Sequence, residues 1–519
     1  MKLKSVKLKN FRSYKKETTI NVDDLTVFVG KNDIGKSTVL EALDIFFNEG
    51  KGVIKLDKED INKGSLAEGD TDIFITAVFT DLPTKIILDA TNETTFEDEF
   101  LLNDDNCLEI TKRYPNAGTA KVFVKAKHPK NPNCSDLLLK KNTDYRRIIE
   151  QKNIECESMA INAIMRKAIW KHYSEDLQLG ESEIDTSKED AKNIWEKIQN
   201  YLPVFTLFQS DRKNSDGDSE VQDPLKEAVK EILAEDDIKA MFDSISQRVS
   251  DRLTEVSTNT LLKLQEMNPE IASSLNPVIP QSASLKWADV YKNVSITGDE
   301  SIPINKRGSG VKRLILINFF RAEAERRLNS TPQQSIIYAI EEPETSQHTD
   351  HQRMLVRAFR GLSEANNTQV MLTTHSSVVV KGLDFSNLRL VCVDENQCKT
   401  VRNVEPNQLP YPSLNEINYI AFNDLTEEYH NELYGYIEAE GKLADFKNGK
   451  PLLPYVRLLK NGNTRDEPKI LTEIIRHQIH HPENTHNVRF DFSQLSQSTD
   501  LMRNFISNTL IKKLSSDEI

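Results

Sequence analysis

The chain has 519 residues, of which 38% are hydrophobic, 7% aromatic and 28% charged. This composition is that of an ordinary globular protein with several domains, and it excludes collagenous, low-complexity and wholly disordered chains. Asp and Glu number 80 against 67 Lys and Arg, so the formal net charge is −13. An acidic chain is not a general nucleic-acid coating protein, although a local basic surface could still bind nucleic acid.

The cysteines and the lengths of the apolar runs indicate in which cellular compartment the protein is expected. The five cysteines form no C-x-x-C pair, and the chain contains no stretch of about 18 consecutive apolar residues. We therefore expect reduced cysteines, no membrane-spanning helix and a cytoplasmic location.

Residues 1–134 are expected to form the first part of an α/β domain. Residues 1–16 alternate apolar with basic side chains, as in a half-exposed strand, and contain no acid. Such lysines either protect a sheet edge or form a nucleic-acid surface. Residues 25–29 read as a strand buried on both faces, and residues 37–47 as a helix. Residues 72–80 and 119–126 are predicted to be further strands.

The remainder of the chain divides by its patterning. Residues 135–284 are predicted to form a mostly helical insertion, within which 178–191 reads as an acidic surface connection. Strand-like sequence returns in 285–403, the second part of the α/β domain. A proline-rich linker at 403–413 then leads into a helical region, 413–519.

The first chemical motif is Gly30-Lys31-Asn32-Asp33-Ile34-Gly35-Lys36-Ser37, which fits G-x-x-x-x-G-K-[ST] without a mismatch. A predicted strand precedes it and a predicted helix follows, which is the context this phosphate-binding loop requires. Backbone N–H groups and the helix N-terminus would face a triphosphate. Lys36 would bridge the β- and γ-phosphates of ATP, and the Ser37 hydroxyl would ligate Mg²⁺.

Two further strands end in side chains suited to the same chemistry. Residues 336–340 are followed by Glu341 and Glu342, of which the first would hold Mg²⁺ and the second would activate the attacking water. Residues 370–374 end at His375, which we interpret as a sensor of the γ-phosphate. Within the second part of the domain, just upstream of these strands, Ser309 and Gly310 lie in a second anion-binding turn before a helix. A dimer could use that turn to close one subunit over its partner's ATP.

The order of these motifs resembles the ABC-type ATPases of the SMC, RecF and OLD group, and residues 9–14 (KNFRSY) resemble that group's opening strand and turn. The resemblance covers residues 1–126 and 285–400. It implies an ABC-type P-loop ATPase head, split by the helical insertion, that forms a head-to-head dimer with ATP and Mg²⁺ at the interface. The residues expected at the nucleotide are Arg12, Asn32, Asp33, Gly35, Lys36, Ser37, Thr38, Ser309 and Gly310.

Two features depart from the group's pattern or cannot be located. Residues 345–349 (TSQHT) replace the usual Leu-His-Pro form after the acids, and the glutamine loop cannot be placed. Within the group, residues 208–212, 222–224, 416–419 and 428–435 are similar to PtuA-like ATPases of Septu and Septu-like retron antiphage systems. This likeness implies an ATPase switch that controls a separate nuclease subunit, of HNH or another type.

The C-terminal region leaves alternatives open. Residues 400–519 lack the strand-borne acids of a Toprim nuclease, so we expect a partner to supply any cleavage. Arg476 and His481 nevertheless resemble the R-x4-6-H motif of HEPN ribonucleases, and His480, His481 and Asn484 could be read as an HNH site. A RecF-like DNA-repair ATPase that clamps DNA is a further alternative.

Overall fold

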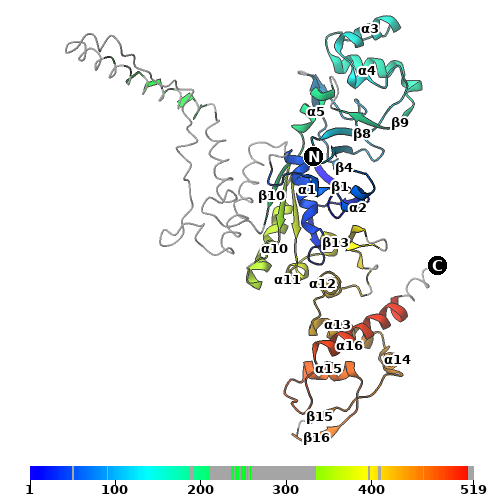
Figure 1. The fold of residues 1–519 in the computed structure, drawn as a ribbon, viewed down its shortest axis with the longest axis vertical. Helices are drawn as coiled ribbons and strands as arrows, with labels where there is room; N and C mark the ends of the chain where they lie inside the picture. The colour runs from blue at the N-terminus through cyan, green and yellow to red at the C-terminus, as the bar shows by residue number, and fades with distance from the viewer. Residues whose placement is uncertain are drawn as a thin grey trace. The chain divides into compact units, whose positions relative to one another are not determined.

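The computed structural model describes residues 1–49, 52–89, 92–186, 191–209, 335–345, 347–394, 398–406, 409, 411–459 and 461–511, with isolated residues between 235 and 258. The chain divides into two compact units, one of Met1–Ser210 with Phe320–Ile519 and the other of Asp211–Phe319. The described residues of the second unit are mostly helical. The first unit contains both sheets and the C-terminal helices (Figure 1).

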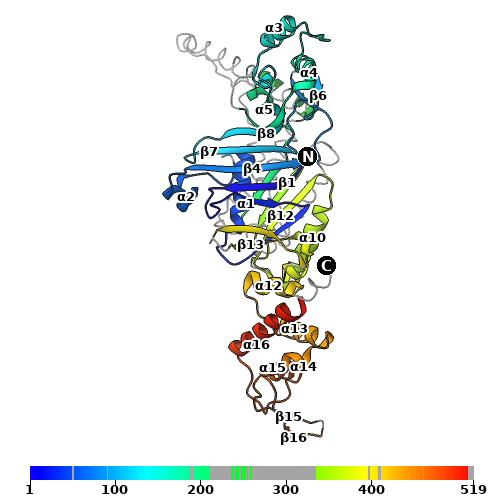
Figure 2. The ribbon, with the colours of Figure 1, turned by 90° about the vertical axis from the view of Figure 1, so that its right-hand side faces the viewer.

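A six-stranded antiparallel sheet forms one layer of the first unit. Its strands, in spatial order, are β2 (Thr18–Asn21), β1 (Lys2–Lys9), β4 (Asp72–Thr80), β7 (Leu108–Pro115), β8 (Lys121–Pro129) and β9 (Leu179–Asp185). Figure 2 shows β1, β4, β7 and β8 side by side. The β1 strand therefore lies inside the sheet, so its lysines do not protect an edge.

The second sheet is mostly parallel and carries the predicted motifs. Its strands, in spatial order, are β10 (Val204–Phe208), β11 (Ile336–Glu341), β12 (Thr368–Thr373), β3 (Leu25–Val29), β13 (Leu388–Val393) and β14 (Lys399–Asn403). Only β14 runs antiparallel to its neighbour. The strands β3, β11 and β12 are buried throughout, as expected for a parallel sheet covered on both faces.

Helix α1 (Lys36–Asn48) packs between the two sheets. Its apolar residues share one core cluster with side chains of β4 and of β10–β12. Phe47 stacks on Phe205 of β10 with ring centroids 5.4 Å apart and meets Phe79 of β4 edge to face at 6.1 Å. Helix α10 (Thr349–Ser363) also covers the second sheet, and the short helix α11 (Ser377–Lys381) follows β12.

The region between β8 and β11 differs from the sequence expectation of a helical insertion beginning at 135. Helices α3 (Asn142–Lys152), α4 (Asn162–His172) and α5 (Ala191–Gln199) are present, but β9 and β10 belong to the two sheets. Residues 179–185 read as a surface connection because β9 is an edge strand whose side chains are mostly exposed or half-buried. Earlier in the chain, the short helix α2 (Lys63–Ala67) precedes β4, and a hairpin of β5 (Ile86–Asp89) and β6 (Asn92–Thr94) follows it.

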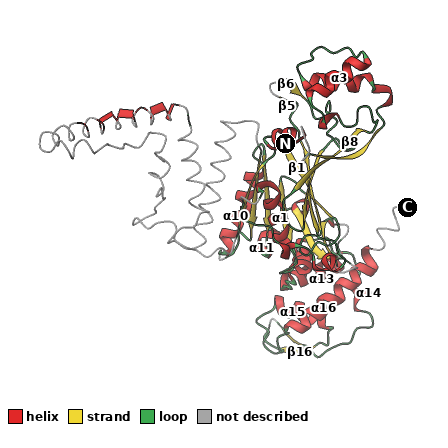
Figure 3. Cartoon of the chain, turned by 45° about the horizontal axis from the view of Figure 1, so that its top comes forward, coloured by secondary structure: helices red, strands yellow, loops and turns green. Residues whose placement is uncertain are grey.

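The C-terminal region is helical, as predicted, with one small hairpin (Figure 3). It contains α12 (Leu414–Phe422), α13 (Glu427–Ala439), α14 (Leu443–Lys447), β15 (Val456–Leu458), β16 (Thr464–Asp466), α15 (Leu471–His480) and α16 (Phe492–Phe505), which continues as a π-helix over Ile506–Ile511. These helices enclose their own core around Tyr429, Leu433 and Met502. Among the helices of the described residues, none combines the length and apolar character needed to cross a bilayer.

Candidate nucleotide site

The carboxyl ends of the neighbouring parallel strands β3, β12 and β11 lie at one edge of the second sheet. Register pairs Phe28 of β3 with Thr373 of β12, and Thr373 with Glu341 of β11. Since side chains that follow adjacent parallel strands converge at such an edge, the predicted motifs come together here. The loop after β3, the acids after β11 and His375 after β12 thus share one site, although more than half of the chain separates them.

The loop between β3 and α1 adopts conformations that require glycine at two positions. Gly30 has φ +152° and an added Cβ would lie 2.6 Å from the Val391 carbonyl oxygen. Gly35 has φ +101°, and an added Cβ would lie 2.7 Å from Ser13 Oγ. Both positions therefore exclude a side chain, and α1 begins directly after Gly35 with its N–H groups facing the loop.

Lys36 closes this loop from within. Its ammonium donates to the carbonyl oxygens of Gly30 at 2.9 Å and Lys31 at 3.0 Å, and the residue is only 5% exposed. Burial lowers the pKa of Lys36, and the nearby Glu342, Glu344 and Asp33 partly oppose that shift. A triphosphate in the loop would give this cation charged acceptors in place of neutral carbonyls.

The turn at residues 11–14 packs against the same loop. The Tyr14 hydroxyl donates to the Gly35 carbonyl oxygen at 3.1 Å. Arg12, with φ +47°, donates from Nε to Asp60 at 2.7 Å and from Nη1 to Glu41 of α1. Hydrogen bonds to these two acids contribute to raising the pKa of Arg12, although burial opposes the shift. Arg12 therefore lies next to the first turns of α1, where the sequence analysis expects it.

Glu341 ends β11 as a buried carboxylate. Burial, followed by the charges of Glu41 and Glu342, raises its pKa to about 8, while a hydrogen bond with Ser37 lowers it. Within the described residues no donor reaches Glu341 Oε1. A hydroxyl and a carboxylate side by side, one of its oxygens without a protein donor, fit the all-oxygen coordination that Mg²⁺ prefers.

Glu342 follows in a strained conformation, with φ +39°. Its backbone N–H donates to the Thr373 carbonyl oxygen at 3.0 Å, which ties the end of β11 to the end of β12. The carboxylate oxygen Oε2 lies 3.3 Å from His375 Nδ1, and both side chains are partly exposed. Positive φ at a non-glycine residue costs about 1 kcal/mol or more and is typical of functional sites.

The other residues predicted at the nucleotide are placed as follows. Asn32 and Asp33 lie exposed in the loop, and Asp33 has φ +57°. Thr38 is buried in the first turn of α1. Ser309 and Gly310 lie outside the described residues, so the predicted second turn stays a prediction.

Two residues of this edge were not singled out for this chemistry from the sequence. Gln209 directly follows β10, whose Phe208 pairs with Ile340, and it therefore stands level with Glu341. The apolar run before it, residues 204–208, was the available signal. Glu344, the third acid after β11, is buried and contacts the residues around His375.

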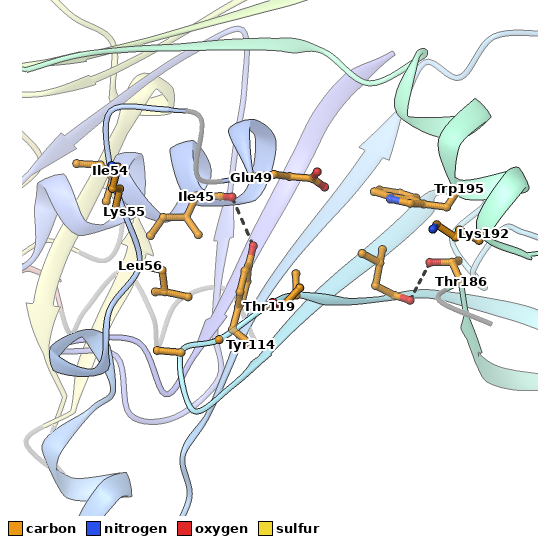
Figure 4. Close-up of a pocket in the computed structure, with 14 residues that line it drawn as sticks. Ile45, Glu49, Ile54, Lys55, Leu56, Tyr114, Thr119, Thr186, Lys192 and Trp195 are labelled. Atoms are coloured by element: carbon orange, nitrogen blue, oxygen red, sulfur yellow. Dashed lines mark hydrogen bonds between the residues drawn. The ribbon is translucent and has the colours of Figure 1, made fainter.

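A cavity of about 970 Å³ lies at the opposite end of α1, lined by Ile45 and Glu49 of that helix, by Tyr114 and by Trp195 (Figure 4). Behind it, the buried ammonium of Lys112 pairs with Glu49 at 2.6 Å and lies 5.4 Å from the Trp195 ring centroid. Ile45, the lining residue within α1, lies nine residues after Lys36, which is about 14 Å along the helix at 1.5 Å per residue. It is therefore distinct from the nucleotide site.

The basic residues near the N-terminus are largely paired. Lys2 lies 2.6 Å from Asp24, Lys7 lies 2.6 Å from Glu109, and Lys15 lies 2.5 Å from Glu68. Acids from neighbouring elements thus compensate much of the charge that suggested a nucleic-acid surface.

In the C-terminal region, the two residues of the HEPN-like motif face different neighbours. Arg476 pairs with Glu438 at 3.0 Å and lies 4.0 Å over the Tyr434 ring. His481 lies beyond the end of α15, 3.0 Å from Glu483, and stacks on His477. Asn484, from the HNH reading, is buried and donates to the Tyr455 hydroxyl and the Val456 carbonyl oxygen.

This site has a loop that requires glycine at two positions, a lysine inside that loop, a helix directly after it and acids at the end of a nearby strand. That arrangement defines a P-loop ATPase. The chain belongs to the AAA ATPase domain family, whose model matches residues 1–380. The predicted α/β P-loop ATPase head with a helical C-terminal region is confirmed.

Among curated proteins, the chain is similar to Endonuclease GajA of Bacillus cereus strain VD045, with 22% identity over 412 residues, and of strain HuB5-5, with 21% over 436 residues. These alignments cover 76% and 77% of the chain but 59% of each relative. Among solved structures, the SMC head domain from Thermotoga maritima matches 78% of the chain and all of its own length, with 14% identity and a TM-score of 0.33. An SMC head domain from Pyrococcus furiosus matches 77% of the chain and 95% of its own length, with 13% identity and a TM-score of 0.34.

Proposed function

We propose that this chain is the ATP-hydrolysing switch subunit of a bacterial antiphage defence complex and that it controls a separate nuclease subunit. The observation that carries the ATPase part is the meeting of Lys36, Glu341, Glu342 and His375 at one sheet edge. The curated relatives are endonucleases by name, and the chain spans about three-fifths of their length. The name of these relatives supports a link between this ATPase and nucleic-acid cleavage.

In the hydrolysis step, Lys36 and the N–H groups of the loop bind the phosphates, and Glu342 accepts a proton from the attacking water. Ser37 and Glu341 would hold Mg²⁺, which neutralises developing phosphate charge when bound. His375 lies beside Glu342 and is suited to donate to the γ-phosphate. Glu342, the proposed base, and His375, the proposed γ-phosphate sensor, therefore lie close enough to interact.

Glu342→Gln tests this step. The amide cannot accept the proton, so kcat should fall by roughly 10²–10⁴-fold while ATP still binds. Glu364→Gln makes the same chemical change at an exposed position after α10 and should leave kcat unchanged. Full turnover by Glu342→Gln protein would refute the assignment of the base, and with it the proposed chemistry.

The switch requires a head-to-head dimer in which Ser309 and Gly310 of one subunit close on the ATP of the other. Ser309→Arg should then leave ATP binding nearly intact but abolish hydrolysis. Mixing Ser309→Arg with Lys36→Ala protein should restore partial activity, since one of the two sites in a mixed dimer carries neither defect. Mixed dimers that form but stay inactive would contradict the composite site.

The nuclease is expected on a partner of the PtuA-associated kind, of HNH or another type. If the chain itself cleaved RNA through Arg476 and His481, the purified protein would be a ribonuclease without a partner. The pairing of Arg476 with Glu438 and Tyr434 favours a structural role for it. Incubation of the purified chain with labelled RNA and DNA tests this directly, and cleavage that His481→Ala abolishes in a well-folded protein would refute the need for a nuclease partner.

A further inference from the structure

Glu344 is a third carboxylate at the nucleotide site, and the hydrolysis step described above leaves it without a role. Its side chain is only 2% exposed. Oxygen Oε1 accepts hydrogen bonds from the Thr374 hydroxyl and from the His375 backbone N–H, both at 2.8 Å. Within the described residues, no donor reaches Oε2. Burying a carboxylate that is only partly satisfied is costly, so a purely structural position would favour a neutral residue.

One nitrogen of the His375 ring lies close to two acids. Its Nδ1 is 3.3 Å from Glu342 Oε2 and 3.4 Å from Glu344 Oε1. A carboxylate facing one imidazole nitrogen favours a proton on that nitrogen and fixes the orientation of the ring. The other nitrogen, Nε2, can then donate to the reacting phosphate only if it too carries a proton, so the imidazolium form of the ring is the one that makes both contacts.

We propose that Glu344 is a positioning residue for hydrolysis, which holds His375 by its backbone and by Nδ1 so that Glu342 does not hold the Nδ1 proton alone and can act as the base for the attacking water. With Glu342 as its only anionic neighbour, the Nδ1 proton would occupy the base that the reaction needs. Glu344 supplies a second anion for that proton at nearly the same distance. This inference rests on the proposed ATPase function.

Glu344→Gln separates this role from simple anchoring. The amide oxygen can still accept from Thr374 and from the His375 backbone, but the negative charge facing Nδ1 is lost. We expect ATP affinity within about twofold of wild type, an unchanged melting temperature and an unchanged KM for ATP. We expect kcat to fall about tenfold or more, since misplaced catalytic groups cost up to about 10²-fold. An unchanged kcat would refute the proposal.

A double-mutant cycle shows whether Glu344 acts through His375. If it does, the Glu344→Gln/His375→Ala protein should be no slower than His375→Ala alone. Independent effects that multiply would overturn the proposal. Thr374→Val gives a second measurement if Glu344→Gln lowers the melting temperature. It removes one hydrogen bond to Glu344 but keeps the charge, so it should cost less in kcat than Glu344→Gln; an equal loss would show that anchoring alone matters.

A spectroscopic readout makes this test independent of turnover. In nucleotide-free protein with ¹⁵N-labelled histidine, the His375 resonances should show Nδ1 protonated in wild type and a shifted tautomer balance in Glu344→Gln. An identical His375 spectrum in both proteins would refute the positioning role. A wild-type protein that hydrolyses no ATP would instead refute the proposed function, while the spectrum would still report on Glu344.

Discussion

Replacing Lys36 by methionine should remove most of the ATP affinity. In the structure this cation makes two hydrogen bonds, to the carbonyl oxygens of Gly30 and Lys31. Bound phosphate oxygens would take over both. Hydrogen bonds that involve a charged group contribute about 1.5–3 kcal/mol each, so two such bonds to phosphate are worth at least about 3 kcal/mol. That free energy corresponds to roughly a 100-fold rise in Kd.

Titration with a fluorescent ATP analogue in the presence of Mg²⁺ measures this change. Lys31→Met is the matched control, because Lys31 belongs to the same loop and is exposed. Its loss should change Kd by less than about threefold if only screened long-range charge is removed. An equal weakening by both substitutions would show that general positive charge, and not the buried Lys36, holds the nucleotide.

Three further outcomes follow from the buried groups. Burial raises the pKa of Glu341 to about 8, above its ordinary value of 4.5. The free energy of unfolding should therefore fall as pH rises from about 4.5 to 8, because the unfolded chain releases this proton first. Glu341→Gln should reduce this pH dependence, measured by urea unfolding. Burial lowers the pKa of His430 from 6.5 to about 4. The C-terminal region should therefore lose on the order of 2–3 kcal/mol of its free energy of unfolding as pH falls from 6.5 to 4. His430→Gln should reduce this loss, measured by thermal melting. Arg476→Ala should cost about 1 kcal/mol through its contacts with α13, whereas the exposed His481→Ala should leave the melting temperature unchanged; both should retain wild-type ATPase rates.

The phosphate-binding loop could be predicted from the sequence because its chemistry is local. Gly30 and Gly35 are needed for the backbone angles of the loop, and the loop ends at Lys36 as the motif requires. The close contacts with Val391 and Ser13, by contrast, come from distant parts of the chain. The acids at the end of β11 and the histidine after β12 were likewise recognisable, since each follows a short run of apolar residues in a buried strand.

Other parts depended on pairing between distant segments, which a single sequence does not reveal. Gln209 joins the site only because β10 pairs with β11, whose first residue lies more than 100 positions later. Glu344 accepts a hydrogen bond from the His375 backbone only because β11 and β12 are neighbours. The strand β9 was missed because an exposed edge strand carries no apolar alternation to distinguish it from a loop.

The pairing of β3 with β12 also constrains how the protein is made. Leu3 of β1 already contacts Gln369 of β12, 366 positions later. At synthesis rates of 5–20 residues per second, β3 and α1 wait roughly 20–70 s for the strand that completes their sheet. During that interval the edge of β3 and the apolar faces of α1 lack their native cover. A nascent chain arrested before residue 368 should therefore depend on chaperones, and its phosphate-binding loop should acquire ATP affinity only after β12 has emerged.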